Sequence, residues 1–254
     1  MWNGDYAFVI RSLVAKDFKV RYRNMSLGIL WSLLNPLIMM GVLTFIFTEI
    51  FSNPGDKTYP LAVLCGLVPF NFFALAWLTG TTSLLENASL IKRVPVPRQV
   101  FPIASVLSNC LHLVIQIGLL FVAILAFGRG VNIYWLWLPV MWSLEILFVL
   151  GLAFMFSAVN VFIRDTRYVV ESANTILFWL VPIFYSFARI PARFRGVYEF
   201  NPVAALVLMM RTILLDGRPP VYSTMENLLF VSLFTFGTGL FVFSKLQKGF
   251  YEYL

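Results

Sequence analysis

Long stretches without a charged side chain constrain this sequence more than any other feature. A helix needs about 20 consecutive apolar residues to cross a hydrocarbon core of about 30 Å. The stretches are continuous rather than alternating between apolar and polar residues, which favours helices over the short strands of a membrane barrel. Glu145 is the one charge inside the fourth stretch, and residues 168–170 can extend the fifth. The six stretches lie at 24–48, 58–85, 99–128, 130–163, 172–188 and 227–244.

We therefore predict an all-α membrane protein with six transmembrane helices in a single domain over residues 1–254. The composition agrees, because the chain is 60% hydrophobic and 12% charged, whereas soluble domains have about 25% charged residues. This balance excludes a soluble enzyme, a disordered tail and a nucleic-acid-binding protein, despite the net charge of +7. Two cysteines are too few for a disulfide scaffold. The spans are expected at about 27–51, 61–85, 100–127, 134–163, 168–188 and 226–244.

The distribution of Lys and Arg predicts how the helices are oriented. Six spans put both termini on one side of the membrane, and 12 of the 19 Lys and Arg residues lie on that side. Because basic loops stay in the cytoplasm, we expect both termini to be cytoplasmic. Trp135 and Trp137 fall at the outer end of the fourth span, where indole rings favour the headgroup layer.

Residues 5–23 are predicted to form a basic amphipathic helix in the cytoplasmic membrane interface. Ser12, Lys16, Lys19 and Arg23 share one stripe of this helix, and apolar residues cover much of the remainder, which is typical of interfacial helices. Two interpretations stay open. The helix is either a plain anchor to anionic lipids or a lever that also touches a cytoplasmic partner.

The loop between the second and third spans, residues 86–98, is short and basic. Asn87 or Ser89 can cap a short helix, and Pro95 and Pro97 would end it. A rigid, basic element on the cytoplasmic face suits a docking site. An inert connector would have the same features.

The outer segment 191–216 is expected to contain two short helices. Asn201 followed by Pro202 is a favourable helix start, and Gly217 suits the end. The apolar run 200–210 is too short to cross the membrane. Short helices dipping into the outer leaflet are tolerated where the backbone between them is buried in protein or faces water. This pair therefore suggests a lid at the outer mouth of a pathway.

No motif for catalysis is present, and we predict neither catalytic nor metal-binding residues. The sequence has no P-loop and no cluster with metal-ligand spacing. For His112 a hydrogen-bonded packing role is favoured over a ligand, and for Glu145 packing or local hydration is favoured over a functional role. The 17% aromatic content is the positive clue. Rings facing a lumen would suit sugar rings or close a wide pore, although lipid-facing bulk explains many of them.

Four segments resemble the ABC-2 type permeases that export polysaccharides, most closely those for O-antigen and capsule. Residues 90–98 resemble the family's coupling element, and residues 162–165 resemble its second cytoplasmic loop. Asn201-Pro202 with Arg211 resembles its outer helical pair. The family's opening pattern is matched by Arg21, Tyr22, Arg23, Leu27, Gly28, Trp31 and Pro36.

This resemblance implies a channel formed by two copies of the chain, with two copies of a separate ABC ATPase beneath it. ATP and Mg would bind the ATPase, so this chain would be a transmembrane subunit that holds no cofactor and is not an enzyme. The cargo would be a polysaccharide attached to a polyprenyl diphosphate lipid, exported across the inner membrane. The N-terminal helix and residues 86–98 would dock on the ATPase, and spans 1 and 5 would line the lumen.

Each role is assigned to named residues. We expect ATPase coupling at Glu86, Leu90, Lys92, Arg93, Pro95, Arg98, Arg164 and Asp165. The lipid diphosphate is expected to meet Lys16, Lys19, Arg21 and Arg23, because charge-assisted contacts to phosphate are strong. The channel lining is assigned to Trp31, Phe178, Trp179, Phe184, Tyr185 and Phe187, and the outer gate to Tyr198, Asn201 and Arg211.

Two other functions stay open from the sequence. One is an ABC-2 exporter of teichoic acid or another small amphipath. The other is an intramembrane enzyme of lipid-linked sugar metabolism, which would need clustered acids or histidines near the interface. The carboxylates of this chain are scattered instead.

Overall fold

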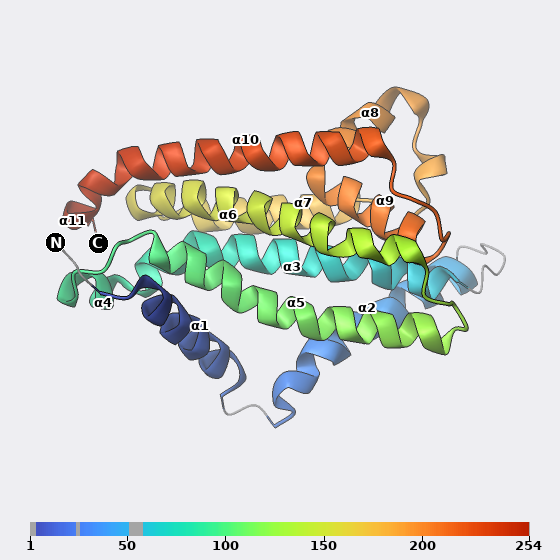
Figure 1. Ribbon diagram of the computed structural model, residues 1–254, viewed down its shortest axis with the longest axis horizontal. Helices are drawn as coiled ribbons and strands as arrows, with labels where there is room; N and C mark the ends of the chain where they lie inside the picture. Colours follow the sequence, from blue (N-terminus) through green and yellow to red (C-terminus); the bar gives the residue numbers. More distant parts are fainter. Residues whose placement is uncertain (1–3, 24–25, 51–57, 254) are drawn as a thin grey trace.

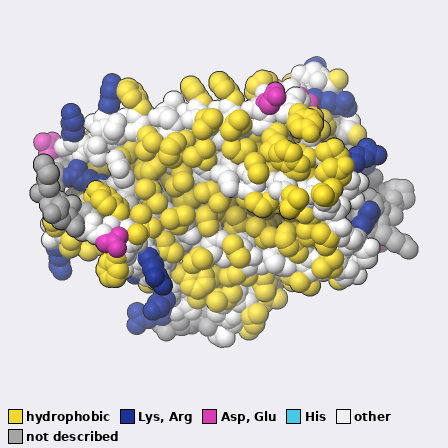
Figure 2. All heavy atoms as spheres, in the orientation of Figure 1, with side chains coloured by type: hydrophobic (Ala, Val, Ile, Leu, Met, Phe, Trp, Pro, Cys, Tyr) yellow, Lys and Arg dark blue, Asp and Glu magenta, His cyan; other side chains and the backbone are white. Residues whose placement is uncertain are grey.

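The computed structural model describes residues 4–23, 26–50 and 58–253, and these residues form helices without any strand. Five helices are long and apolar enough to cross a membrane, or six if one bent pair of helices counts as a single span. Figure 2 shows apolar side chains over the middle of the visible face and most Lys and Arg side chains toward its two ends. The prediction of an all-α, multi-pass membrane protein is therefore confirmed.

The long helices run roughly side by side along the molecule (Figure 1). The first span, Gly28–Ile50, contains a 3₁₀ turn η1 (Gly28–Leu30), helix α2 (Trp31–Phe45) and a π-helical end η2 (Ile46–Ile50). The expected end of this span at residue 51 lies outside the described residues. The other spans are α3 (Tyr59–Glu86), α5 (Val100–Ala126), η3 (Ile133–Trp137) with α6 (Leu138–Phe162), and α10 (Tyr222–Leu246).

Helix α3 is the centre of the bundle. Of the best apolar window in its span, 72% is buried, the largest share of any span. Helices α2, α5, α6, α7 and α9 all pack against it. A helix that is apolar on every side lies either inside a bundle or in lipid, and its sequence does not distinguish the two. The contacts of α3 show that it lies inside the bundle.

The fifth expected span is shorter than the predicted range 168–188. Helix α7 covers only Thr166–Leu180, and its 15 residues would rise about 22 Å at 1.5 Å per residue. Residues 181–186 continue without regular helix. Val181 and Ile183 are fully buried, which is the condition under which non-helical backbone is tolerated at membrane depth.

The segment 191–216, predicted to lie on the outer side, folds into two helices, α8 (Ala192–Phe200) and α9 (Pro202–Leu214), after a short turn η4 (Phe187–Arg189). Helices α8 and α9 meet at 98°. Asn201 begins α9, because its Oδ1 accepts from the backbone N–H groups of Val203 and Ala204 at 3.1 and 3.4 Å. The sequence signal for this helix start is therefore confirmed.

The opposite end of the molecule gathers α1 (Tyr6–Tyr22), α4 (Ala88–Arg93), η5 (Gln247–Gly249) and α11 (Phe250–Tyr253) (Figure 1). Helix α1 lies obliquely against α5. Its Leu13 is buried, whereas Phe8 and Val20 are 68% and 61% exposed. Apolar side chains of α1 thus lie both toward the bundle and away from it.

Candidate functional site

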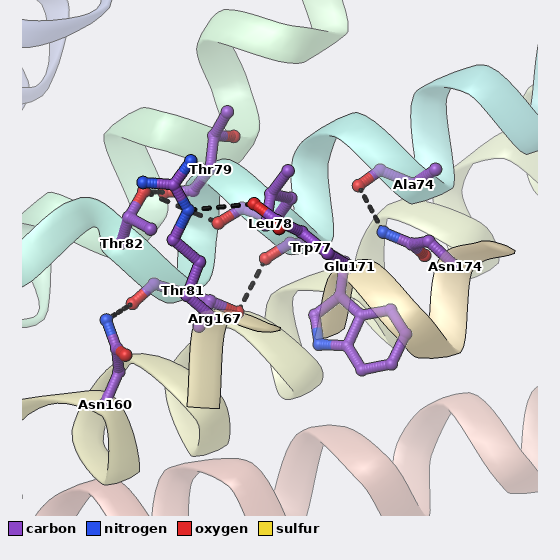
Figure 3. Close-up of polar contacts among 10 residues, drawn as sticks. All are labelled: Ala74, Trp77, Leu78, Thr79, Thr81, Thr82, Asn160, Arg167, Glu171 and Asn174. Carbon is purple, nitrogen blue, oxygen red and sulfur yellow. Dashed lines mark hydrogen bonds and ion pairs between the residues drawn. The ribbon is translucent and has the colours of Figure 1, made fainter. Parts of the chain in front are cut away.

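Helix α7 has a buried side and an exposed side that carries polar and charged groups. Thr166 and Val170 are buried. On the exposed side, the Nε atom of Arg167 lies 2.9 Å from the Oε1 atom of Glu171 (Figure 3), and Thr175 is exposed one turn further. Arg167 lies in the first turn of α7, next to the exposed Arg164 and Asp165, so this ion pair is near the end of the bundle. Further along, the exposed side also carries Ile176 and Trp179. The exposed side of α7 therefore has a charged start and a mixed polar and apolar continuation.

Three asparagines from three neighbouring helices hold the position of α3. Figure 3 shows two of them, Asn160 from α6 and Asn174 from α7, pointing at α3, and the third is Asn109 from α5. Interhelical hydrogen bonds of this kind stabilise membrane bundles by about 0.6 kcal/mol each on average. Their Nδ2 atoms donate to the backbone carbonyls of Thr81 and Ala74, each at 3.1 Å, and to the Thr79 hydroxyl at 2.8 Å.

The predicted lining aromatics divide into an inward and an outward set. Phe184 is only 7% exposed because the ring of Phe47 stacks on it at 5.2 Å. Trp179 is 60% exposed, although its ring contacts Phe184 at 5.3 Å. Tyr185 also contacts Phe184, at 5.2 Å. The structure thus builds one cluster in which Phe184 is the buried base and Trp179 is presented outward.

The remaining lining candidates lie in three different settings. Phe178 is half-buried and joins the same cluster, with its ring 6.0 Å from that of Phe184. Phe187 lies beyond the cluster under the guanidinium of Arg195, whose Cζ is 5.8 Å from the ring centroid. Trp31 is 47% exposed but begins α2, whereas Phe47 of the cluster lies in η2, beyond the other end of α2.

The irregular segment after α7 is held by side-chain donors. Arg211 in α9 donates from Nε to the carbonyl of Ala62 at 3.0 Å, from Nη1 to that of Tyr185 at 3.2 Å, and from Nη2 to that of Ile183. The Tyr59 hydroxyl donates to the carbonyl of the intervening residue at 2.7 Å. Three consecutive carbonyls outside a helix are thereby satisfied. This is how a span can break without leaving unpaired polar groups in an apolar setting.

Two of the three predicted gate residues share one cavity. Tyr198 and Asn201 line a largely apolar space of about 560 Å³ between the end of α7 and helix α8, together with Tyr185 and Arg189. The hydroxyls of Tyr185 and Tyr198 are 3.4 Å apart. Arg211 instead lines a separate, more polar cavity of about 480 Å³, so it supports the segment from behind rather than facing the same space.

The predicted coupling element, residues 86–98, has an exposed and an inward side. Lys92, Arg93 and Pro95 are exposed, Glu86 is exposed at the start, and Leu90 is half-buried. Arg98 turns inward, where its Nη1 donates to the carbonyl of Gln247 and its Cζ lies 5.7 Å from the Phe250 ring centroid.

Residues 162–165, predicted as the second cytoplasmic loop, lie next to this element. Arg164 and Asp165 are both exposed at the start of α7. A small cavity of about 270 Å³ is lined by Arg164 together with Glu86 and Arg167. Glu86 and Arg164, which are 78 positions apart in the sequence, thus lie on one surface.

Three of the four basic residues expected to meet a diphosphate share an open groove on α1. Lys16, Lys19 and Arg23 line this groove of about 880 Å³. Lys16 is also engaged elsewhere, because its Nζ lies 3.0 Å from Asp17 Oδ1 and donates to Asn87 Oδ1 at 2.8 Å. Arg21 is half-buried outside this lining, and burial lowers its pKa from the ordinary value.

A partly buried polar network joins α1 to two spans. The sequence named Tyr22 and His112 separately but did not predict that they meet. The Tyr22 hydroxyl lies 2.6 Å from Ser32 Oγ and 2.9 Å from His112 Nδ1. His112 Nε2 lies 3.1 Å from Gln116 Nε2, which donates to the Ser32 carbonyl at 3.3 Å. His112 therefore has the hydrogen-bonded packing role that the sequence favoured. The spacing of His112 and Gln116 on one helix face was the available signal.

Comparison with known proteins gives one family across most of the chain. The profile of the ABC-2 type transporter family matches residues 9–215. The chain is 30% identical to an O-antigen export system permease protein RfbA of Klebsiella pneumoniae, over all of this chain and 98% of that protein. It is 26% identical to RfbA of Myxococcus xanthus, with 98% and 96% covered. It is 22% identical to the polysialic acid transport protein KpsM of Escherichia coli, with 94% and 93% covered.

Proposed function

The chain belongs to the ABC-2 type transporter family, and we propose that it is the permease subunit of an ATP-driven exporter of lipid-linked polysaccharide. The observation that carries this proposal is similarity over the full length to proteins named as O-antigen export permeases. The cargo is a polysaccharide joined to a polyprenyl diphosphate. It crosses the inner membrane, and both termini of the permease are cytoplasmic.

Two copies of the chain form the channel. The exposed side of α7 supports this arrangement, because Ser172 and Thr175 are exposed in the middle of that helix. Polar side chains within a membrane-spanning segment usually face the bundle interior or water rather than lipid, so a second copy across a wet passage would suit them. Trp179, 60% exposed at the end of α7, would then offer a flat apolar face to sugar rings while the sugar hydroxyls stay hydrated.

The bent pair α8–α9 is a re-entrant element that closes the outer mouth. Its 98° bend returns the chain toward the same end of the bundle. The cavity at Tyr198 and Asn201 would widen if α8 moved away from the segment after α7, since the hydroxyls of Tyr198 and Tyr185 are joined by a long 3.4 Å contact across it. Arg211 keeps the base of this element attached to α3 through Ala62.

Two copies of a separate ATPase bind ATP and Mg²⁺ and dock on the cytoplasmic end. The exposed side chains of Lys92, Arg93 and Pro95 supply the contact surface, and the adjoining loop adds Arg164 and Asp165. The short α4 helix and its proline-rich continuation give this surface a defined shape, since proline restricts the backbone.

The groove on α1 receives the lipid diphosphate as α1 lies in the cytoplasmic membrane interface. Lys16, Lys19 and Arg23 line it, and charge-assisted contacts to phosphate oxygens are strong. The double variant Lys16→Ala with Arg23→Ala should lower export, whereas Arg11→Ala, an exposed residue outside the groove, should not. Unchanged export in the double variant would rule out this role.

The proposed function is tested by deleting the gene in its native host and following the glycan. Surface glycan should be lost and lipid-linked glycan should accumulate on the inner leaflet of the membrane. Complementation with the intact chain should restore the surface glycan. Unchanged surface glycan in the deletion strain would contradict the function.

A further inference from the structure

The cytoplasmic end of the molecule has its own apolar core, and the last described residues are part of it. This second core joins α1, α3, α4, α5, α6, α10 and α11. Phe250 in α11 is fully buried in it. Its ring contacts that of Phe243 at 5.6 Å and that of Phe162 at 6.0 Å. The segment 247–253 therefore folds back into the bundle after α10 instead of leaving it.

The same segment binds the coupling element. Arg98 is the last residue of the element and stands two positions before α5. Its Nη1 donates to the carbonyl of Gln247, and its guanidinium lies 5.7 Å from the centroid of the Phe250 ring. A hydrogen bond from a charged donor and a cation–π contact thus converge on one arginine.

The element is anchored at two further points. Near its start, Lys16 of α1 donates to Asn87 Oδ1 at 2.8 Å. In its middle, Ile91 is 7% exposed and belongs to the second core. Between the anchors, Lys92 and Arg93 stay exposed. The element is therefore a surface strip held from below at its start, middle and end.

We propose that the segment 247–253 is a working part of the coupling unit, with Arg98 and Phe250 as positioning residues. An element attached only through its chain ends could pivot at Pro95 and Pro97 and absorb a push from the ATPase. Fixed at Arg98, it passes the push to α10 as well as to α5, because Gln247 and Phe250 directly continue α10. This inference rests on the proposed function as a permease coupled to an ATPase.

The test compares the Arg98→Gln variant with two control variants, Arg93→Gln and Lys248→Gln, in the native host. Both controls replace an exposed basic residue. We measure surface glycan per folded permease and the amount of ATPase that co-purifies with the permease. Arg98→Gln should retain the ATPase but lower surface glycan about tenfold, the effect of losing one charge-assisted hydrogen bond. Arg93→Gln should lose ATPase, because its side chain faces outward, and Lys248→Gln, exposed on the same segment, should change neither.

Conservative variants separate positioning from simple stability. Arg98→Lys keeps the cation over Phe250 and one donor, so it should restore much of the export. Phe250→Leu keeps the core filled but removes the aromatic face, so it should behave like Arg98→Gln. If Phe250→Leu does not fold, Arg98→Gln and Arg98→Lys still decide the question.

Three results would overturn the inference. The first is that the Arg98→Gln variant exports as much glycan as the wild type. The second is that its export falls only in proportion to the amount of folded permease. The third is that it loses co-purified ATPase as severely as Arg93→Gln does. Failure of the wild-type chain to bind an ATPase or to support surface glycan would instead refute the proposed function, which keeps the two failures distinct.

Discussion

Replacing Gly239 by alanine should force α10 away from α6. A Cβ at Gly239 would lie 2.1 Å from the carbonyl oxygen of Gly151 and 3.0 Å from its Cα, whereas ordinary contacts begin at 3.4 Å. All of these partners are backbone atoms, so no side-chain rotation can relieve the overlap. Gly237, two residues earlier, is exposed, and a Cβ placed there would meet nothing within 4 Å. It provides the matched control on the same helix.

The change in stability caused by Gly239→Ala follows from two opposing contributions. Overpacking costs about 1–3 kcal/mol, and here the strain is at the upper end because backbone must move. Replacing glycine by alanine inside a helix returns about 0.5–1 kcal/mol. We expect Gly239→Ala to lose about 2 kcal/mol of stability net, which corresponds to a fall in Tm of about 4–8 °C for a chain of this size. Gly237→Ala should be neutral or slightly stabilising.

The assay is thermal unfolding of the purified permease in detergent, followed by tryptophan fluorescence. Gly151→Ala supplies a second arm, because its Cβ would lie 2.5 Å from the Thr235 carbonyl oxygen. One separation of the two helices relieves both overlaps, so the double variant should cost less than the sum of the single variants. Equal Tm values for Gly239→Ala and Gly237→Ala would refute the close approach of these helices.

Three further outcomes are expected. Arg211→Gln should raise labelling of an Ile183→Cys reporter by an impermeant maleimide severalfold, because Ile183 is fully buried and its carbonyl accepts from Arg211. Arg211→Lys should not rescue it, because a lysine lacks the fork that reaches three carbonyls; unchanged labelling would contradict this clamp. Tyr22→Phe should destabilise the chain by about 1–2 kcal/mol and expose α1 to protease, and unaltered digestion would count against the network. Trp179→Ala should raise ion leak or lower export, whereas Phe230→Ala, an exposed ring on α10, should do neither; equal behaviour of the two variants would remove Trp179 from the lining.

The sequence could predict that long helices form and that the protein is a membrane protein, because both depend on the length of local apolar stretches. The charge-free stretches predicted the helices α2, α3, α5, α6 and α10, and the Asn201-Pro202 pair predicted the start of α9. Both signals are local, since crossing lipid requires about 20 apolar residues and capping requires one side chain near the helix start. The early end of α7 also had a local signal, which the prediction of a span over 168–188 passed over. Pro182 follows Val181, the extended residue at the end of α7, and proline disfavours helical backbone at the residue before it.

The roles of single residues depended on partners that are distant in the sequence. Arg211 was predicted as a gate residue, and what the sequence did not indicate is that it holds backbone carbonyls, including that of Ala62, 149 positions away. Arg98 looked like one more basic residue of a docking surface, yet it binds the Gln247 carbonyl, also 149 positions away. Phe184 looked like a lining ring and is covered by Phe47.

The sequence by itself determined that this is a multi-pass helical membrane protein, because the free energy of burying apolar length in lipid is set residue by residue. The family followed from a different signal, the similarity of the sequence to known permeases. The sequence also restricted which loops could present basic groups at each end. Only the tertiary structure decided which of those groups face outward and which hold the fold together. An arginine has the same five donors in either case, and the choice is made by the backbone carbonyls that other helices bring within hydrogen-bonding distance of it.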